Sequence, residues 1–136
     1  MLYAIHAHAQ SPSGWQVLKD RKQACQIAVP TGWTADKMMP GNVTAPDKKA
    51  NVIFGGKPPG VTYADIIKMA KEMFKPVKTF DESASRTWFA SAAKGASSSW
   101  YIALNTAPVC EAQIEFRDAA FEADAKQMIA SLKSAK

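Results

Sequence analysis

Cys25 and Cys110 are the only cysteines in this chain, and each lies in a short run of alternating side chains that is typical of a β-strand. Alternation places Cys25 on the same side of its run as Ile27 and Val29, and Cys110 shares a side with its own apolar neighbours. These matched positions predict that the two strands lie side by side or nearly so, with both sulfurs facing the core. We therefore expect a disulfide between them. Two separate buried thiols are the alternative.

A disulfide also indicates where the protein works, because such bonds persist in oxidising compartments. We expect a periplasmic or secreted protein. The bond would close a loop of about 85 residues, for which chain entropy gives about 4–5 kcal/mol of stabilisation before strain. Because both sulfurs lie on apolar faces, we interpret the bond as a structural staple and not as a reactive pair.

The first ten residues are predicted to be the remnant of an export signal or a disordered leader. Ala7-His8-Ala9 has small residues where a signal peptidase requires them, although the stretch before it is short and has no basic start. We expect a single α+β domain over residues 11–136. No apolar run approaches the roughly 20 residues that a membrane-spanning helix needs, so the sequence predicts no transmembrane helix.

The composition is that of an ordinary folded domain with a basic surface. Of its 136 residues, 47% are hydrophobic and 21% are charged, which excludes a disordered chain. The net charge of +5 comes mainly from scattered lysines, whereas nucleic-acid-binding domains gather their basic residues on one face. We expect no nucleic-acid partner and a monomer or weak dimer. Weak attraction to anionic lipid or to an acidic partner stays open.

The rest of the chain divides into strand and helix patterns. Strands are predicted at residues 15–19, 25–29, 51–54, 77–80, 88–92, 99–104 and 109–116, and helices at residues 62–75 and 119–136. Thr62 is the predicted N-cap of the first helix, and Pro76 ends it. Residues 34–49 are predicted to form a loop of about 16 residues, longer than most loops without a function. This order predicts an α+β fold, with an antiparallel β-sheet of about six or seven strands sandwiched between helices.

No catalytic or metal-binding motif is found in the expected domain. The only histidines, His6 and His8, fall in the expected leader, so the domain lacks the base of a Ser-His-Asp or Cys-His unit and most ligands of a zinc site. The glycine-rich residues 55–60 do not make a nucleotide-binding loop, because two prolines without N–H groups follow Lys57. We expect no enzyme activity, no cofactor and no metal.

Three segments together resemble a known superfamily. They are the strand that ends Ile27-Ala-Val-Pro-Thr-Gly-Trp33, the mid-chain helix between strands, and the ending that runs from Ile114-Glu-Phe116 through Phe121 to Met128-Ile-Ala-Ser-Leu-Lys133. The pattern is similar to the PsbP-like superfamily, which includes a photosystem accessory protein, a Ran-binding import factor and bacterial proteins of unassigned role. The resemblance implies an antiparallel sheet sandwiched between helices and, loosely, a non-catalytic role in binding a partner. It assigns a role to no individual residue.

These observations favour a non-catalytic exported domain that binds a protein partner through residues 34–49. The side chains expected to contribute are Trp33, Lys37, Lys48, Lys49 and Lys57. For Trp33, covering the edge of the core is the alternative role.

Two other functions stay open. One is a carrier of a small apolar ligand, with a pocket between sheet and helix lined by Met69, Met73 and Phe74. The other is a hydrolase that uses two carboxylates, for which Asp36 and Asp47 are candidates although nothing in their spacing requires them to meet.

Overall fold

The computed structural model describes residues 14–95 and 97–135, so the expected leader and both histidines lie outside the described residues. The strands are β1 (Gln16–Lys19), β2 (Cys25–Val29), β3 (Thr34–Ala35), β4 (Asn42–Thr44), β5 (Ala50–Gly56), β6 (Pro76–Glu82), β7 (Arg86–Lys94), β8 (Ser97–Leu104), β9 (Cys110–Phe116) and β10 (Lys133–Ser134). The helices are α1 (Tyr63–Phe74), the short 3-10 helix η1 (Ala119–Phe121) and α2 (Glu122–Ser131).

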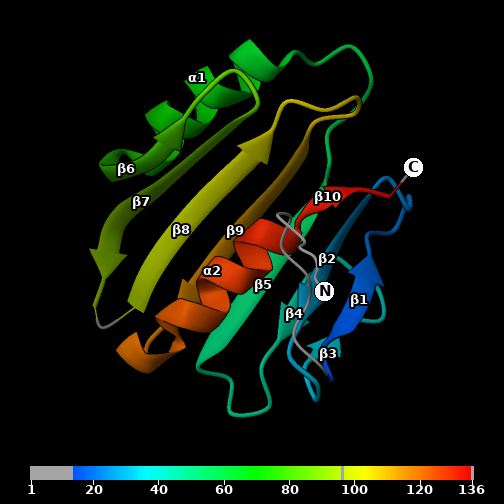
Figure 1. Ribbon diagram of the computed structural model, residues 1–136, viewed down its shortest axis with the longest axis vertical. Coiled ribbons are helices and arrows are strands. Elements are labelled where there is room, and N and C mark those ends of the chain that lie inside the picture. Colours follow the sequence, from blue (N-terminus) through cyan, green and yellow to red (C-terminus); the bar gives the residue numbers. More distant parts are fainter. Residues whose placement is uncertain (1–13, 96, 136) are drawn as a thin grey trace, which may run out of the picture.

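Seven strands form one antiparallel sheet in the order β3-β4-β5-β9-β8-β7-β6, which we call the main sheet. Helix α1 packs on one face of it, against β7 and β8. Helix α2 and a smaller sheet of order β1-β2-β10 cover the other face (Figure 1). The predicted α+β architecture, an antiparallel sheet between helices, is confirmed. The predicted strands at residues 15–19 and 25–29 pair with each other as β1 and β2 in the smaller sheet.

The alternation in β9 divides the main sheet into a buried face and a partly open face. Four side chains of this strand are buried against α2 and the smaller sheet: Cys110, Ala112, Ile114 and Phe116. Glu111, Gln113 and Glu115 lie on the face that carries α1 and are half-buried. The strand therefore places an apolar row in the core and a polar row on the other face, as the sequence predicts.

The predicted disulfide is present and connects the two sheets. Sγ of Cys25 in β2 and Sγ of Cys110 in β9 are 2.06 Å apart, and the two Cα atoms are 5.8 Å apart. The two strands do not pair with each other, because they belong to different sheets that pack face to face. The bond therefore crosses between layers and does not join neighbouring strands of one sheet.

A buried carboxylate holds the turn between β1 and β2 next to the disulfide. Oδ1 of Asp20 accepts hydrogen bonds from the backbone N–H groups of Ala24 at 2.8 Å and Cys25 at 2.9 Å. Oδ2 accepts a third from Gly56 at the end of β5, at 3.3 Å. A larger residue at position 56 would be crowded, because a Cβ there would lie 3.1 Å from Cβ of Ala24 and 3.3 Å from Sγ of Cys25.

The prediction of a long loop at residues 34–49 is wrong. This segment contains β3 and β4, which pair with each other and extend the main sheet beyond β5. The strands are only two and three residues long, and one buried side chain, Val43, anchors them to the core. Such short strands leave almost no alternating pattern in a sequence, and Pro40 and Gly41 between them indicate a turn.

The predicted helix over residues 119–136 is partly wrong, because α2 ends at Ser131. Leu132 is extended, with φ −63° and ψ 129°, and its side chain is buried in the core. Residues 133 and 134 then form β10, in which Lys133 pairs with Gln26 of β2. Lys133 thus lies in a strand and not at a helix end. Among the described residues, neither helix has the length and apolar character needed to cross a bilayer.

Helix α1 has the predicted boundaries. The Thr62 hydroxyl accepts a hydrogen bond from the N–H of Asp65 at 3.2 Å, and Lys75 caps the other end in the left-handed region just before Pro76. Ile66 and Ala70 are buried on the sheet. This side of the helix therefore packs against β7 and β8.

Candidate functional site

The main sheet is only partly covered on the face that carries α1. Nζ of Lys71 in α1 lies 2.7 Å from Oε1 of Glu82 in β6, so the helix lies toward that edge of the sheet. On the same face, Gln113 of β9 pairs in register with Ile53 of β5, and 47% of Ile53 is exposed. The helix therefore leaves uncovered the part of this face that β9 and β5 form, which we call the open floor.

A polar network lies at the boundary between this floor and α1. Glu111 of β9 accepts a hydrogen bond from the Tyr101 hydroxyl on Oε1 at 2.7 Å, and its Oε2 lies 2.7 Å from Nζ of Lys57. Phe74, at the end of α1, packs on the Tyr101 ring with 5.2 Å between centroids. These side chains, together with Ile53, line a cavity of about 320 Å³.

The Tyr101 phenol is held in its neutral form. Burial raises the pKa of Tyr101 well above its usual value, and the negative charge of Glu111 raises it further. The phenol therefore acts as a hydrogen-bond donor and keeps its proton. Since both oxygens of Glu111 already have partners, the network provides a fixed polar floor. It does not resemble an acid–base pair, in which one group must exchange its proton near neutral pH.

A second cavity, of about 290 Å³, adjoins the first and exposes two methionines. It lies between β5 and the turn that joins β3 to β4, which we call the methionine turn (residues 36–41). Met38 and Met39 line this cavity with Ile53, and they are 79% and 62% exposed. Large apolar side chains at this exposure are uncommon on a surface with no partner when they gather in one place.

The methionine turn is held in place by hydrogen bonds that its backbone groups form. Oδ1 of Asp36 accepts hydrogen bonds from the N–H groups of Met38 at 2.8 Å and Met39 at 3.0 Å. The N–H of Phe54 in β5 donates to the carbonyl oxygen of Gly41 at 2.8 Å. Gly41 approaches β5 so closely that a Cβ would lie 2.2 Å from the Phe54 carbonyl oxygen. The exposed methionines thus stand on a fixed loop.

A third cavity, of about 690 Å³, lies between the connector from β5 to α1 and the turn before β9. Lys57 and Pro58 line it as well as the first cavity, and Lys22 lies at its edge. Gly56 lines all three cavities. The three hollows therefore follow one another around the end of β5.

Comparison with known proteins identifies the fold. No protein-family model matches the chain, and no curated protein matches it in sequence. The solution structure of cyanobacterial PsbP (CyanoP) from Synechocystis sp. PCC 6803 matches with a TM-score of 0.58, covering 98% of each chain at 12% sequence identity. This chain has a PsbP-like fold. The resemblance predicted from the sequence is confirmed at that level, and the low identity transfers no functional residue to this PsbP-like domain.

The five predicted partner-binding residues of the PsbP-like domain do not form one surface. Lys37 is exposed on the methionine turn, and Lys57 is paired with Glu111. Trp33 is 7% exposed and stacks on Phe121 with 5.6 Å between centroids, so it covers the edge of the core. Lys49 lines the same cavity as Trp33, and Lys48 is exposed in the turn beside it.

The three residues predicted for an apolar-ligand pocket are also separated. Phe74 lines the cavity next to Tyr101. Met69 and Met73 are 54% and 67% exposed, and helical spacing places them on the flank of α1 opposite Lys71. They face the open side of the sheet without being buried under the helix. Met38, Met39 and Ile53 were not predicted as site residues, although two adjacent methionines in a polar segment are a usable signal in the sequence.

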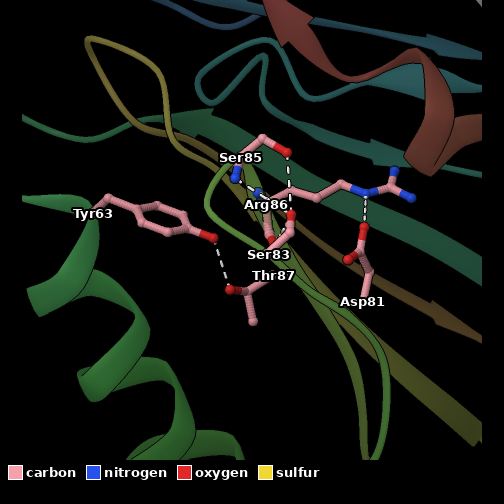
Figure 2. Close-up of polar contacts among 6 residues, drawn as sticks. All are labelled: Tyr63, Asp81, Ser83, Ser85, Arg86 and Thr87. Carbon is pink, nitrogen blue, oxygen red and sulfur yellow. Dashed lines mark hydrogen bonds and ion pairs between the residues drawn. The ribbon is translucent and has the colours of Figure 1, made fainter.

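Another group of polar side chains gathers at the turn between β6 and β7 (Figure 2). The hydroxyl of Ser83 lies 3.1 Å from that of Ser85, and Arg86 forms an ion pair with Asp81. Nearby, the hydroxyls of Tyr63 and Thr87 are 2.7 Å apart and connect the first turn of α1 to β7 (Figure 2). The polar groups of these side chains form hydrogen bonds or ion pairs with one another and with the nearby backbone of the PsbP-like domain. Within the described ranges, no three histidine, cysteine or acidic residues lie close enough to hold a metal ion.

Proposed function

We propose that this protein is a non-catalytic exported domain that binds a protein partner through Met38, Met39 and Ile53. The observation that carries the proposal is the exposure of two adjacent methionines, 79% and 62%, on a loop whose backbone is held in place. Methionine is flexible and polarisable, so it adapts to the apolar side chains of a partner. A fixed loop loses little backbone freedom on binding, which favours affinity.

The charges around this surface indicate the chemistry of the partner. Arg21 and Lys22 line the methionine cavity, and Lys37 is exposed on the same turn. Asp20, the acidic residue that also lines it, has its carboxylate engaged by backbone N–H groups. The partner segment is therefore apolar where it meets the methionines and acidic around them. Such a rim of opposite charge speeds association and is weakened by salt.

Export of the domain is supported by the bond between Cys25 and Cys110, since buried disulfides of this kind persist in oxidising compartments. A binding role also fits the polar network on the open floor, where Glu111 holds both Lys57 and the Tyr101 hydroxyl. These groups are better suited to a rigid surface than to proton transfer.

The test is capture of a partner from native envelope extract, followed by measurement with the purified partner. The Met38→Ser/Met39→Ser variant should bind at least about tenfold more weakly, because burying methionine side chains supplies the affinity. The Met69→Ser/Met73→Ser variant removes two methionines of similar exposure from α1 and should bind like the unaltered protein. Equal loss in both variants, or no loss in the first, would exclude this surface.

A carrier of small apolar ligands is the second candidate, favoured by the cavity of about 320 Å³ that Phe74 and Ile53 line between helix and sheet. Its volume lies at the lower end of the range of ligand pockets. The fluorescent probe 1-anilinonaphthalene-8-sulfonate tests this candidate. Saturable binding that Ile53→Gln abolishes supports a carrier, and the absence of saturable binding excludes it.

A further inference from the structure

A fourth cavity, of about 420 Å³, lies away from the methionine turn and has aromatic walls. It is formed where the turn between β4 and β5 approaches the start of α2, at the lower end of the view in Figure 1. Trp33 and Phe121 form one wall, stacked with 5.6 Å between centroids and 21° between planes. Phe116 lies 5.6 Å from Phe121, so three rings adjoin one another along the cavity.

Three carboxylates line the same cavity. Asp47 accepts a hydrogen bond from the N–H of Lys49 at 2.9 Å, and Asp118 accepts one from Ala120 at 2.9 Å, in each case on Oδ1. Asp124 is the third. None of the ion pairs found among residues 14–95 and 97–135 involves any of the three.

The cavity therefore has a local charge opposite to that of the whole protein. The chain carries a net charge of +5, but Lys49 is the one basic residue among the described residues that line this cavity. Lys48 and Arg117 are exposed close by in the sequence and do not line it. A cation that enters would meet three carboxylates against one ammonium group.

We propose that this cavity binds a small organic cation whose charged group is attached to an apolar body. Because Trp33 and Phe121 stack on each other, a ligand meets only the surfaces that the stack leaves free; these contact its apolar part, and a free ring face attracts the charged group through its quadrupole. The three carboxylates do not form a group that could hold a metal ion, since no such group occurs in the described part of the chain. An ammonium group with alkyl or aromatic substituents fits both the walls and the charge. The cavity is large enough for such a ligand, because its volume of about 420 Å³ lies within the range of about 300–1,000 Å³ that is typical of ligand pockets.

The probe for this site is benzyltrimethylammonium chloride, titrated into the full disulfide-bonded chain at low salt and followed by two-dimensional NMR. Its neutral comparison is benzyl alcohol. The cation should shift the amide signals of Lys49 and Phe121 and the indole signal of Trp33 in a saturable way. Benzyl alcohol should bind at least about threefold more weakly, since exposed carboxylates contribute modestly to each contact.

Removing two of the carboxylates tests the role of charge. The Asp47→Asn/Asp124→Asn variant keeps a side-chain oxygen at position 47 and should bind the cation about fivefold more weakly, with no change for benzyl alcohol. The Asp65→Asn/Glu72→Gln variant makes the same change in net charge on α1 and should leave both affinities unaltered. Equal affinity for the two probes, equal effects of the two variants, or shifts that map elsewhere would each overturn the proposal. The methionine-turn variants are not involved, so this outcome is independent of partner binding.

Discussion

The carboxylate of Asp20 accepts a hydrogen bond from the backbone N–H of Gly56, so a turn of the smaller sheet is joined to the end of β5, beside the cavities. The same carboxylate receives two further N–H groups from its own turn. Because Asp20 is buried, these donors would be left without partners if the side chain were removed.

Asp20→Ala should therefore lower the free energy of unfolding by about 2–4 kcal/mol, since several buried donors lose a charged acceptor together. Urea unfolding with the disulfide intact is the measurement. Asp36→Ala removes a carboxylate that also accepts two backbone N–H groups, but in an exposed turn where water replaces it, and should cost much less. Similar losses in both variants would show that burial of Asp20 is not the cause.

Gly41→Ala should destabilise the protein by about 1–3 kcal/mol and displace the methionine turn, because the new Cβ would collide with the Phe54 carbonyl group. Gly55→Ala is a matched control, since a Cβ there meets Asp20 at an ordinary contact distance of 3.6 Å. Urea unfolding gives the stabilities, and the amide shifts of Met38 and Met39 report on the turn. Unchanged shifts in Gly41→Ala would contradict the close approach to β5.

Reducing the disulfide should lower the free energy of unfolding by about 4–5 kcal/mol, because the bond joins residues 85 apart and restricts the unfolded chain. The measurement is urea unfolding with and without dithiothreitol, with mass spectrometry after alkylation to count free thiols. The Cys25→Ala/Cys110→Ala variant should show no response to the reductant. A wild-type protein equally insensitive to dithiothreitol would contradict the expected contribution.

The stability of the protein should fall as the pH rises above the usual phenol value of 10.0, because the pKa of Tyr101 is raised in the folded state. Above that pH the unfolded chain loses the phenol proton while the folded protein keeps it. Each further rise in pH therefore favours the unfolded state and lowers the free energy of unfolding. Tyr101→Phe should show a smaller decline between about pH 9 and pH 11. Lysines titrate in both proteins, so the difference between the two curves is the quantity to compare. Parallel curves would contradict the assignment.

Long helices and strands that are bounded by clear start and stop residues could be predicted from the sequence. Thr62 and Pro76 bound α1, and the alternating run from Cys110 to Phe116 gave the correct buried face of β9. The cysteine positions gave the correct bond, because two core-facing sulfurs indicate proximity whatever the sheet arrangement. Whether the two strands belong to one sheet or two depends on pairing between distant residues, and alternation within one run carries no such information.

Short elements and local carboxylate contacts could not be predicted. The strands β3, β4 and β10 have three residues or fewer and form only because β5 and β2 offer unpaired edges. Leu132 ends α2 because burying its side chain outweighs one more helical turn, which is a tertiary effect. The candidate site depends on such contacts. Met38 and Ile53 are 15 positions apart and share a cavity through the pairing of β4 with β5.

The smaller sheet has an implication for the order in which the molecule assembles. Its central strand β2 pairs with β1 from the same hairpin and with β10, whose residues follow more than 100 positions later. During synthesis from the N-terminus, this sheet stays one strand short until residues 133 and 134 have been made. The smaller sheet therefore cannot be completed before the C-terminal residues are available, however early its first hairpin forms.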